Sequence, residues 1–116
     1  RDLLIGCCGI ADRLQVPIAA VLQHLDGARF DVLLLRDPSK RIYLRGIPDY
    51  APDLGQVAER LRRDLDLAAY RSVRAFGTSG GGWASFTLGT MLGAERAISM
   101  SGRPPAATFR LARMWE

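Results

Sequence analysis

Short apolar runs alternate with amphipathic stretches along the chain. The runs at residues 3–8 and 30–35 predict buried β-strands, and residues 72–76 and 96–100 predict a third, shorter strand and a fourth strand. The stretches between them repeat apolar residues every three or four positions, as helices with one buried face do. Strands alternating with helices at this spacing predict an α/β fold, a three-layer sandwich around a mostly parallel sheet of about four strands.

The first two helices have recognisable ends. The first is expected to begin close to Pro17 and to end at Gly27. The second is expected to begin after Asp53, whose carboxylate can cap it, with Gln56 three residues later in capping-box spacing. Its inward stripe is predicted to consist of Leu54, Val57, Ala58, Leu61, Leu65 and Ala68.

The remaining segments are less uniform. A helix rich in small residues is predicted at 83–92, ended by Gly93. Residues 40–52 contain a glycine and two prolines. The alternation at 41–45 fits a short edge strand or a loop equally well. The tail at 106–116 is compatible with a last short helix.

Composition is typical of one globular domain spanning residues 1–116, with 48% hydrophobic and 24% charged residues. No apolar run approaches the ~20 residues that span a bilayer, so no membrane partner is expected. The two cysteines, Cys7 and Cys8, are adjacent and form neither a disulfide framework nor a metal site. We therefore expect apolar packing for them, no metal or other cofactor, and a cytoplasmic location.

The net charge of +4 comes almost wholly from arginines, since Lys40 is the only lysine. The densest basic group is interleaved with acids, in the order Glu59, Arg60, Arg62, Arg63, Asp64 and Asp66. Nucleic-acid-binding surfaces instead gather basic residues on one face. The pattern favours a solvated helix face over a phosphate-binding patch, and no nucleic-acid partner.

The motif with most chemical content is Gly77-Thr78-Ser79-Gly80-Gly81, which matches the G-x-S-x-G nucleophile elbow. It follows a predicted strand and precedes a predicted helix, as an elbow does. A serine at such a sharp turn is lifted above the sheet, and Gly77 and Gly81 supply backbone without side chains where the turn is crowded. The alternative is a glycine-rich turn that packs closely, with Ser79 as a plain helix cap.

On these features the chain resembles the α/β-hydrolase superfamily over residues 3–102. The resemblance implies that the four strands are the family's third to sixth, in spatial order second, first, third, fourth. Ser79 would then lie beyond the carboxyl ends of the strands, where open α/β sheets bind ligands. The sheet would be incomplete, and the lack of an initiator methionine also suggests a piece of a longer product.

The resemblance also implies a chemistry, that of an esterase-like or thioesterase-like serine hydrolase or an acyltransferase. Ser79 Oγ would attack a small-molecule acyl substrate and form an acyl-enzyme. The N–H of Gly80 would stabilise the oxyanion, together with that of Gly9 or Ile10 after the first strand.

The family's triad runs serine, acid, histidine, but no histidine follows Ser79. His24 is expected on the surface, and Glu95 at the wrong end of the sheet. Asp12 and Asp37 follow strands at the correct end, although the family does not take its acid from there. The chain alone is therefore expected to be inactive, either as a piece of a longer enzyme or as a module without catalysis.

Two further alternatives remain open. The helix start at Gly80, Gly81 and Gly82 could bind a phosphate or carboxylate through backbone N–H groups. The strand order is also shared by flavodoxin-like folds. A sheet with two uncovered edges would also invite pairing with another chain or with missing strands of a longer product.

Overall fold

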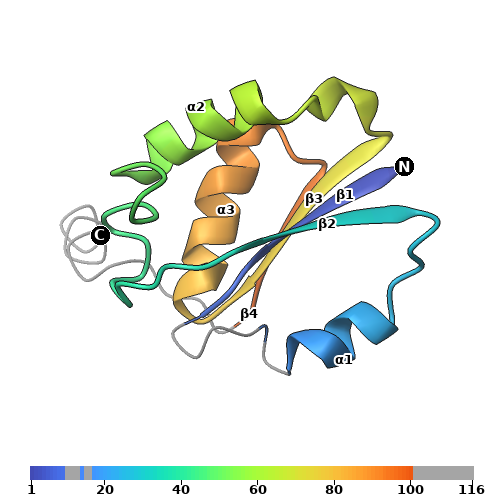
Figure 1. Cartoon of the computed structure of the whole chain (residues 1–116), viewed down its shortest axis with the longest axis horizontal. Helices are drawn as coiled ribbons and strands as arrows, with labels where there is room; N and C mark the ends of the chain where they lie inside the picture. Colours follow the sequence, from blue (N-terminus) through green and yellow to red (C-terminus); the bar gives the residue numbers. More distant parts are fainter. Residues whose placement is uncertain (10–13, 15–16, 101–116) are drawn as a thin grey trace, which may run out of the picture.

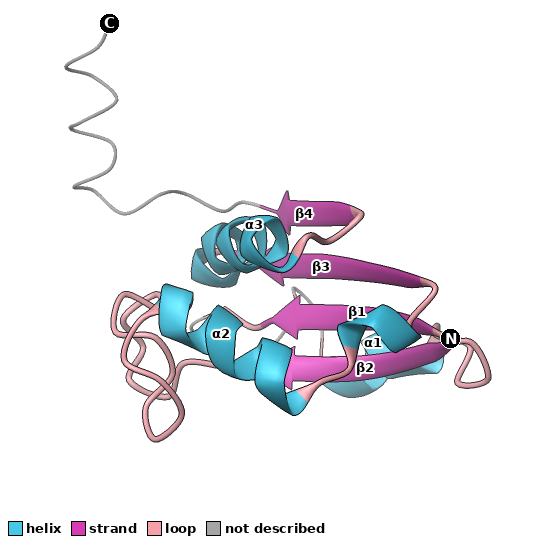
Figure 2. Ribbon diagram, turned by 90° about the horizontal axis from the view of Figure 1, so that it is seen from above, coloured by secondary structure: helices cyan, strands magenta, loops and turns pink. Residues whose placement is uncertain are grey.

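The computed structural model describes residues 1–9, 14 and 17–100 and contains a four-stranded parallel sheet (Figure 2). The order across the sheet is β2-β1-β3-β4. The strands are β1 (Asp2–Cys7), β2 (Phe30–Leu35), β3 (Ser72–Thr78) and β4 (Arg96–Met100). The predicted α/β class and spatial order are confirmed.

The helices form the two outer layers (Figure 1). Helices α2 (Leu54–Asp64) and α3 (Gly80–Leu92) lie on one side of the sheet, and α1 (Ile18–Gln23) lies on the other. A short 3₁₀ helix, η1 (Leu67–Ala69), leads from α2 to β3. Within the described ranges, no helix is both long and apolar enough to cross a lipid bilayer.

The register of the sheet brings three strand ends level with one another. Cys7 at the end of β1 is paired with Leu35 on β2 and with Gly77 on β3. The segments that follow these strands therefore leave the sheet at the same edge. That edge carries Gly9, Asp37 and Ser79, each within two residues of its strand end.

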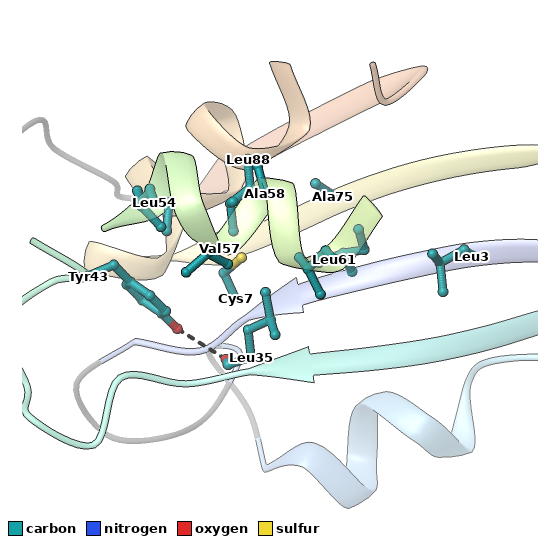
Figure 3. Packing of buried hydrophobic residues seen from close by; sticks show 12 residues of the cluster. Leu3, Cys7, Leu35, Tyr43, Leu54, Val57, Ala58, Leu61, Ala75 and Leu88 are labelled. Atoms are coloured by element: carbon teal, nitrogen blue, oxygen red, sulfur yellow. Dashed lines mark hydrogen bonds between the residues drawn. The ribbon is translucent and has the colours of Figure 1, made fainter. Parts of the chain in front are cut away.

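The core lies between the sheet and helices α2 and α3 (Figure 3). Ile5, Val57 and Leu88 have no exposed surface and come from β1, α2 and α3 respectively. The predicted stripe of α2 is buried at Leu54, Val57, Ala58 and Leu61. Its last predicted member, Ala68, is exposed because the helix ends at Asp64.

The predicted end of α1 and the predicted start of α3 are wrong by several residues. Helix α1 ends at Gln23 rather than at Gly27, and it buries none of its residues. With no buried stripe, little tertiary packing extends this helix. Helix α3 begins at Gly80, three residues before the predicted start, because the glycines tolerate the close packing found there.

The segment at 41–45, for which the sequence pattern fitted an edge strand or a loop equally well, is a loop. Residues 41–45 form turns rather than an edge strand. The only regular feature in 40–52 is an isolated bridge between Ile47 and Ala51.

At the opposite edge of the sheet from Ser79, the fully buried Asp2 anchors the start of β1. Its carboxylate accepts hydrogen bonds from Arg29 Nε (2.7 Å), Arg71 Nη2 (2.8 Å) and Ser72 Oγ (3.0 Å). The bonds from Arg71, and then those from Arg29, hold the pKa of Asp2 well below its usual range despite its burial. Burial with charged partners makes this carboxylate a structural group.

We expect an Asp2→Asn variant to unfold at a lower temperature than the wild type at pH 7. Because the pKa of Asp2 is lowered by folding, its contribution is complete above the unfolded pKa, about 3.9. This stabilising contribution is lost as the pH falls toward and through the pKa of Asp2 in the folded protein. Thermal unfolding followed by circular dichroism should show that the difference in Tm between the wild type and Asp2→Asn becomes smaller as the pH is lowered from 7 to 2. A difference that stays constant across this range would contradict the prediction.

Candidate functional site

Ser79 lies at the junction between β3 and α3, with φ 54° and ψ −128°. Few residues other than glycine adopt a positive φ, and such a conformation costs about 1–3 kcal/mol. The residue is exposed, and its side chain makes no capping hydrogen bond to α3. Ser79 is therefore not a plain helix cap, and the residue lies at the surface.

Backbone hydrogen bonds hold this turn in place. The Ser79 N–H donates to the carbonyl oxygen of Met100 at the end of β4, at 2.9 Å. The Ser79 carbonyl oxygen accepts from the N–H of Gly82, at 3.0 Å. These bonds tie the turn to a strand on one side and to the first turn of α3 on the other, which is how a strained residue is maintained.

The two glycines of the motif lie where β1, β3 and α3 come closest. A Cβ atom on Gly77 would be 2.0 Å from the carbonyl oxygen of Gly81. A Cβ atom on Gly81 would be 2.0 Å from the carbonyl oxygen of Cys7. No side chain fits at either position, so both glycines are needed for α3 to begin directly against the sheet.

Two candidate oxyanion donors lie beside Ser79. Gly80 is the first residue of α3, so its N–H has no acceptor within the helix. Gly9 also lies close, since a Cβ atom built on it would be 3.4 Å from the Ser79 Cβ atom. The other candidate, Ile10, lies outside the described residues.

The loop after β2 is organised by Asp37, which is 5% exposed. Its Oδ1 accepts from the backbone N–H of Ser39 (2.9 Å), and its Oδ2 accepts from those of Arg41 (2.9 Å) and Tyr43 (3.0 Å). Burial acts to raise the pKa of Asp37, but hydrogen bonds from Ser39, Tyr43 and Arg41 outweigh it and lower the pKa. This carboxylate is thus a loop scaffold, with its oxygens turned toward its own loop.

Tyr43 fixes the far end of this loop to the sheet. Its buried hydroxyl donates to the carbonyl oxygen of Cys8 (2.7 Å) and lies 3.0 Å from that of Leu35 (Figure 3). Lys40, Ile42 and Tyr43 all have positive φ values, between 57° and 60°. Asp37 and Tyr43 together therefore hold an unfavourable backbone path next to the turn at Ser79.

A small recess lies between this loop and the start of α3. Its lining consists of Cys8, Gly9, Asp37, Lys40, Ile42, Tyr43, Gly80 and Gly81. The space in it for water-sized groups is about 10 Å³, close to the minimum for one water molecule. The recess is bordered by Gly80, the residue after Ser79, and by Gly9, which lies next to Ser79 in space.

The other predicted acid–base residues lie elsewhere. His24 is exposed at the end of α1, close in sequence to Gly27, whose carbonyl oxygen accepts from Arg1 at the amino end of β1. Glu95 precedes β4, and its N–H donates to Val73 near the start of β3. Both are at the edge of the sheet opposite Ser79, and Asp12 lies outside the described residues.

Both cysteines are buried and unbridged. Burial, and secondarily Cys8, raises the pKa of the Cys7 thiol to about 12. A thiol with this pKa is a poor nucleophile and metal ligand. Within residues 1–9, 14 and 17–100, no three His, Cys, Asp or Glu side chains group in a way that could hold a metal ion.

Sequence reasoning did not identify Tyr43 and Ile42 as neighbours of the turn at Ser79, and it considered Asp37 only as a catalytic acid. The available signal was Asp37-Pro38-Ser39, which begins two residues after the end of a strand and is a pattern typical of an Asx turn. No family model, curated protein or solved structure significantly matches the chain.

Proposed function

We propose that Ser79 is the nucleophile of a serine hydrolase or acyltransferase of the α/β-hydrolase type. The observation that carries this proposal is the strained backbone of an exposed serine between a parallel strand and a helix. A fold keeps such strain where the rest of the structure enforces it, and strained residues of this kind cluster at active sites.

In the proposed reaction, Ser79 Oγ attacks the carbonyl carbon of an ester or thioester. An O–C bond forms, and the carbonyl oxygen becomes an oxyanion near the N–H of Gly80. Collapse of this intermediate breaks the bond to the alcohol or thiol, which leaves with a proton, and an acyl-enzyme remains. Each oxyanion donor typically contributes about 100- to 1,000-fold in rate.

The attack requires a base that accepts the proton of Ser79. His24 is the only histidine of the sequence and lies at the other edge of the sheet. The proposal therefore requires a histidine from polypeptide outside these 116 residues.

A fluorophosphonate probe tests this proposal on the full-length native product. Ser79 Oγ would displace fluoride from phosphorus, and mass spectrometry should find the modification on the peptide that contains Ser79. We expect Ser79→Ala to abolish labelling while the circular dichroism spectrum remains that of the wild type. Heat-denatured wild type provides the background. Equal labelling of the wild type and the Ser79→Ala variant, or no labelling of the native product, would rule the proposal out.

A second candidate function is anion binding at the start of α3. It is favoured by the absence of a side-chain cap, which leaves the N–H groups at the start of α3 without an acceptor from the Ser79 side chain, although that of Gly82 donates to the Ser79 carbonyl oxygen. Inorganic phosphate should then shift the amide resonances of Gly80 and Gly81 in a saturable manner. Unchanged resonances in the presence of phosphate would exclude this candidate.

A further inference from the structure

The side chain of Ile42 packs directly on Gly80, the residue after the proposed nucleophile. A Cβ atom built on Gly80 would be 2.4 Å from Ile42 Cγ2 and 3.2 Å from Ile42 Cβ. The γ-methyl group of Ile42 therefore already occupies the space beside the Gly80 backbone.

Ile42 is also held firmly in this position. Its φ is 58°, and a β-branched residue with such a value is a clear outlier. The residue follows Arg41 and precedes Tyr43, whose backbone N–H groups both donate to the buried Asp37. The Tyr43 hydroxyl, in turn, is bonded to the strand end at Cys8. Because both neighbours are anchored, the backbone at Ile42 cannot move away from Gly80 without breaking these hydrogen bonds.

The space that remains beside Ile42 is small. The recess that it lines with Gly9 and Gly80 has room for about 10 Å³ of water-sized groups. This is enough for about one oxygen atom with its contacts. A branched carbon chain or a ring does not fit there while Ile42 is in place.

We propose that Ile42 limits the size of the acyl group at Ser79, and that the substrate is an ester or thioester of a small, unbranched acid. The inference rests on the proposed function of Ser79. If the oxyanion is stabilised by the N–H of Gly80, the substituent on the carbonyl carbon must lie close to the same backbone. An acetyl group meets this condition, whereas a branched or aromatic acyl group would collide with the Ile42 side chain.

The test replaces Ser79 by cysteine and measures reaction with methanethiosulfonates of different size. The thiolate displaces a sulfinate and forms a mixed disulfide, so no base from outside the chain is needed. We expect Ser79→Cys to react with the methyl reagent at least about tenfold faster than with the benzyl reagent, a ratio of the size that a tight apolar wall produces. The wild type shows how much reagent reacts with Cys7 and Cys8. The methyl-to-benzyl rate ratio of the variant in denaturant gives the intrinsic reactivity of the two reagents.

Two second-site variants assign the selectivity to Ile42. Adding Ile42→Ala removes Cγ2 and is expected to lower the reagent ratio toward the value in denaturant. Ile42→Val keeps a γ-methyl group on the same face and is the matched control, for which the ratio should persist. Folded Ser79→Cys protein without a size preference overturns the inference even if Ile42→Ala does not fold. An Ile42→Ala ratio equal to that of Ile42→Val also overturns it.

The result for Ile42 can be distinguished from the result for the proposed function of Ser79. Fluorophosphonate labelling of the native product without size selectivity at position 79 overturns only the assignment of Ile42. Selectivity that depends on Ile42, combined with labelling at Ser79, supports both. Selectivity without labelling overturns the catalytic proposal and, with it, the assignment of an acyl substrate.

Discussion

Replacing Gly81 with alanine is expected to destabilise the protein by about 4 kcal/mol or more, beyond the usual cost of a single substitution. The added Cβ atom would lie 2.0 Å from the carbonyl oxygen of Cys7 and 2.7 Å from that of Cys8. Both obstacles are backbone atoms of a central strand or its end, so no side-chain rotation can relieve the overlap. Helix α3 would have to move away from β1, and the buried contacts of Leu88 would be disrupted.

Thermal unfolding followed by circular dichroism measures this effect. A loss of 4 kcal/mol corresponds to a fall in Tm of about 15 °C for a domain of this size. Gly27→Ala is the matched control, because a Cβ atom at Gly27 meets nothing within 4 Å. That change should alter stability by less than about 1 kcal/mol. Similar Tm values for the two variants would show that α3 does not approach β1 as closely as described.

The parts of the fold that the sequence predicted well are those where local and tertiary signals agree. The run at 30–35 is apolar at every position except Asp31 and became β2 with the predicted bounds. Helix α2 begins where Asp53 predicted, with the Asp53 side chain accepting from the Gln56 N–H at 2.8 Å. A capping residue and a buried stripe specify the same helix here, so its start was readable without the structure.

Predictions failed where tertiary contacts decide the local structure. The start of α3 at Gly80 was missed because three consecutive glycines have low helix propensity. The crowding against Cys7, which only glycine tolerates, is a long-range contact that periodicity does not reveal. In α1, a helical pattern was present, but the helix is short because its apolar residues find no core to bury in.

The candidate site was only partly readable for a similar reason. The motif placed Ser79 between a strand and a helix, and the structure has it there. The packing of the Ile42 side chain on Gly80 could not be anticipated, because isoleucine rarely adopts a positive φ and the pattern at 41–45 fits a strand or a loop. That conformation is maintained by Asp37, a residue whose role depends on contacts up to six residues away.

Replacing Asp37 with asparagine should therefore lower the stability of the fold and loosen the position of Ile42 beside Gly80. An amide group at the position of Oδ2 cannot accept from the N–H groups of Arg41 and Tyr43. Each buried donor left without an acceptor costs about 1–3 kcal/mol, so we expect a loss of about 2–5 kcal/mol in the free energy of unfolding at pH 7. Asp49→Asn, an exposed change in the same loop, is the matched control and should have little effect.

The pH dependence of stability separates the effect of the negative charge of Asp37 from the effect of its side-chain shape, which asparagine preserves. Because folding lowers the pKa of Asp37, the advantage of the wild type over Asp37→Asn is complete above the unfolded pKa of about 3.9. It is lost as the pH falls through the folded value, because protonation removes the charged acceptor. In the Ser79→Cys background, Asp37→Asn should also lower the methyl-to-benzyl reagent ratio, as Ile42→Ala does, while Asp49→Asn leaves it unchanged. A destabilised Asp37→Asn protein that retains the full ratio would show that Ile42 keeps its position without the carboxylate, and that the loop is held by Tyr43 alone.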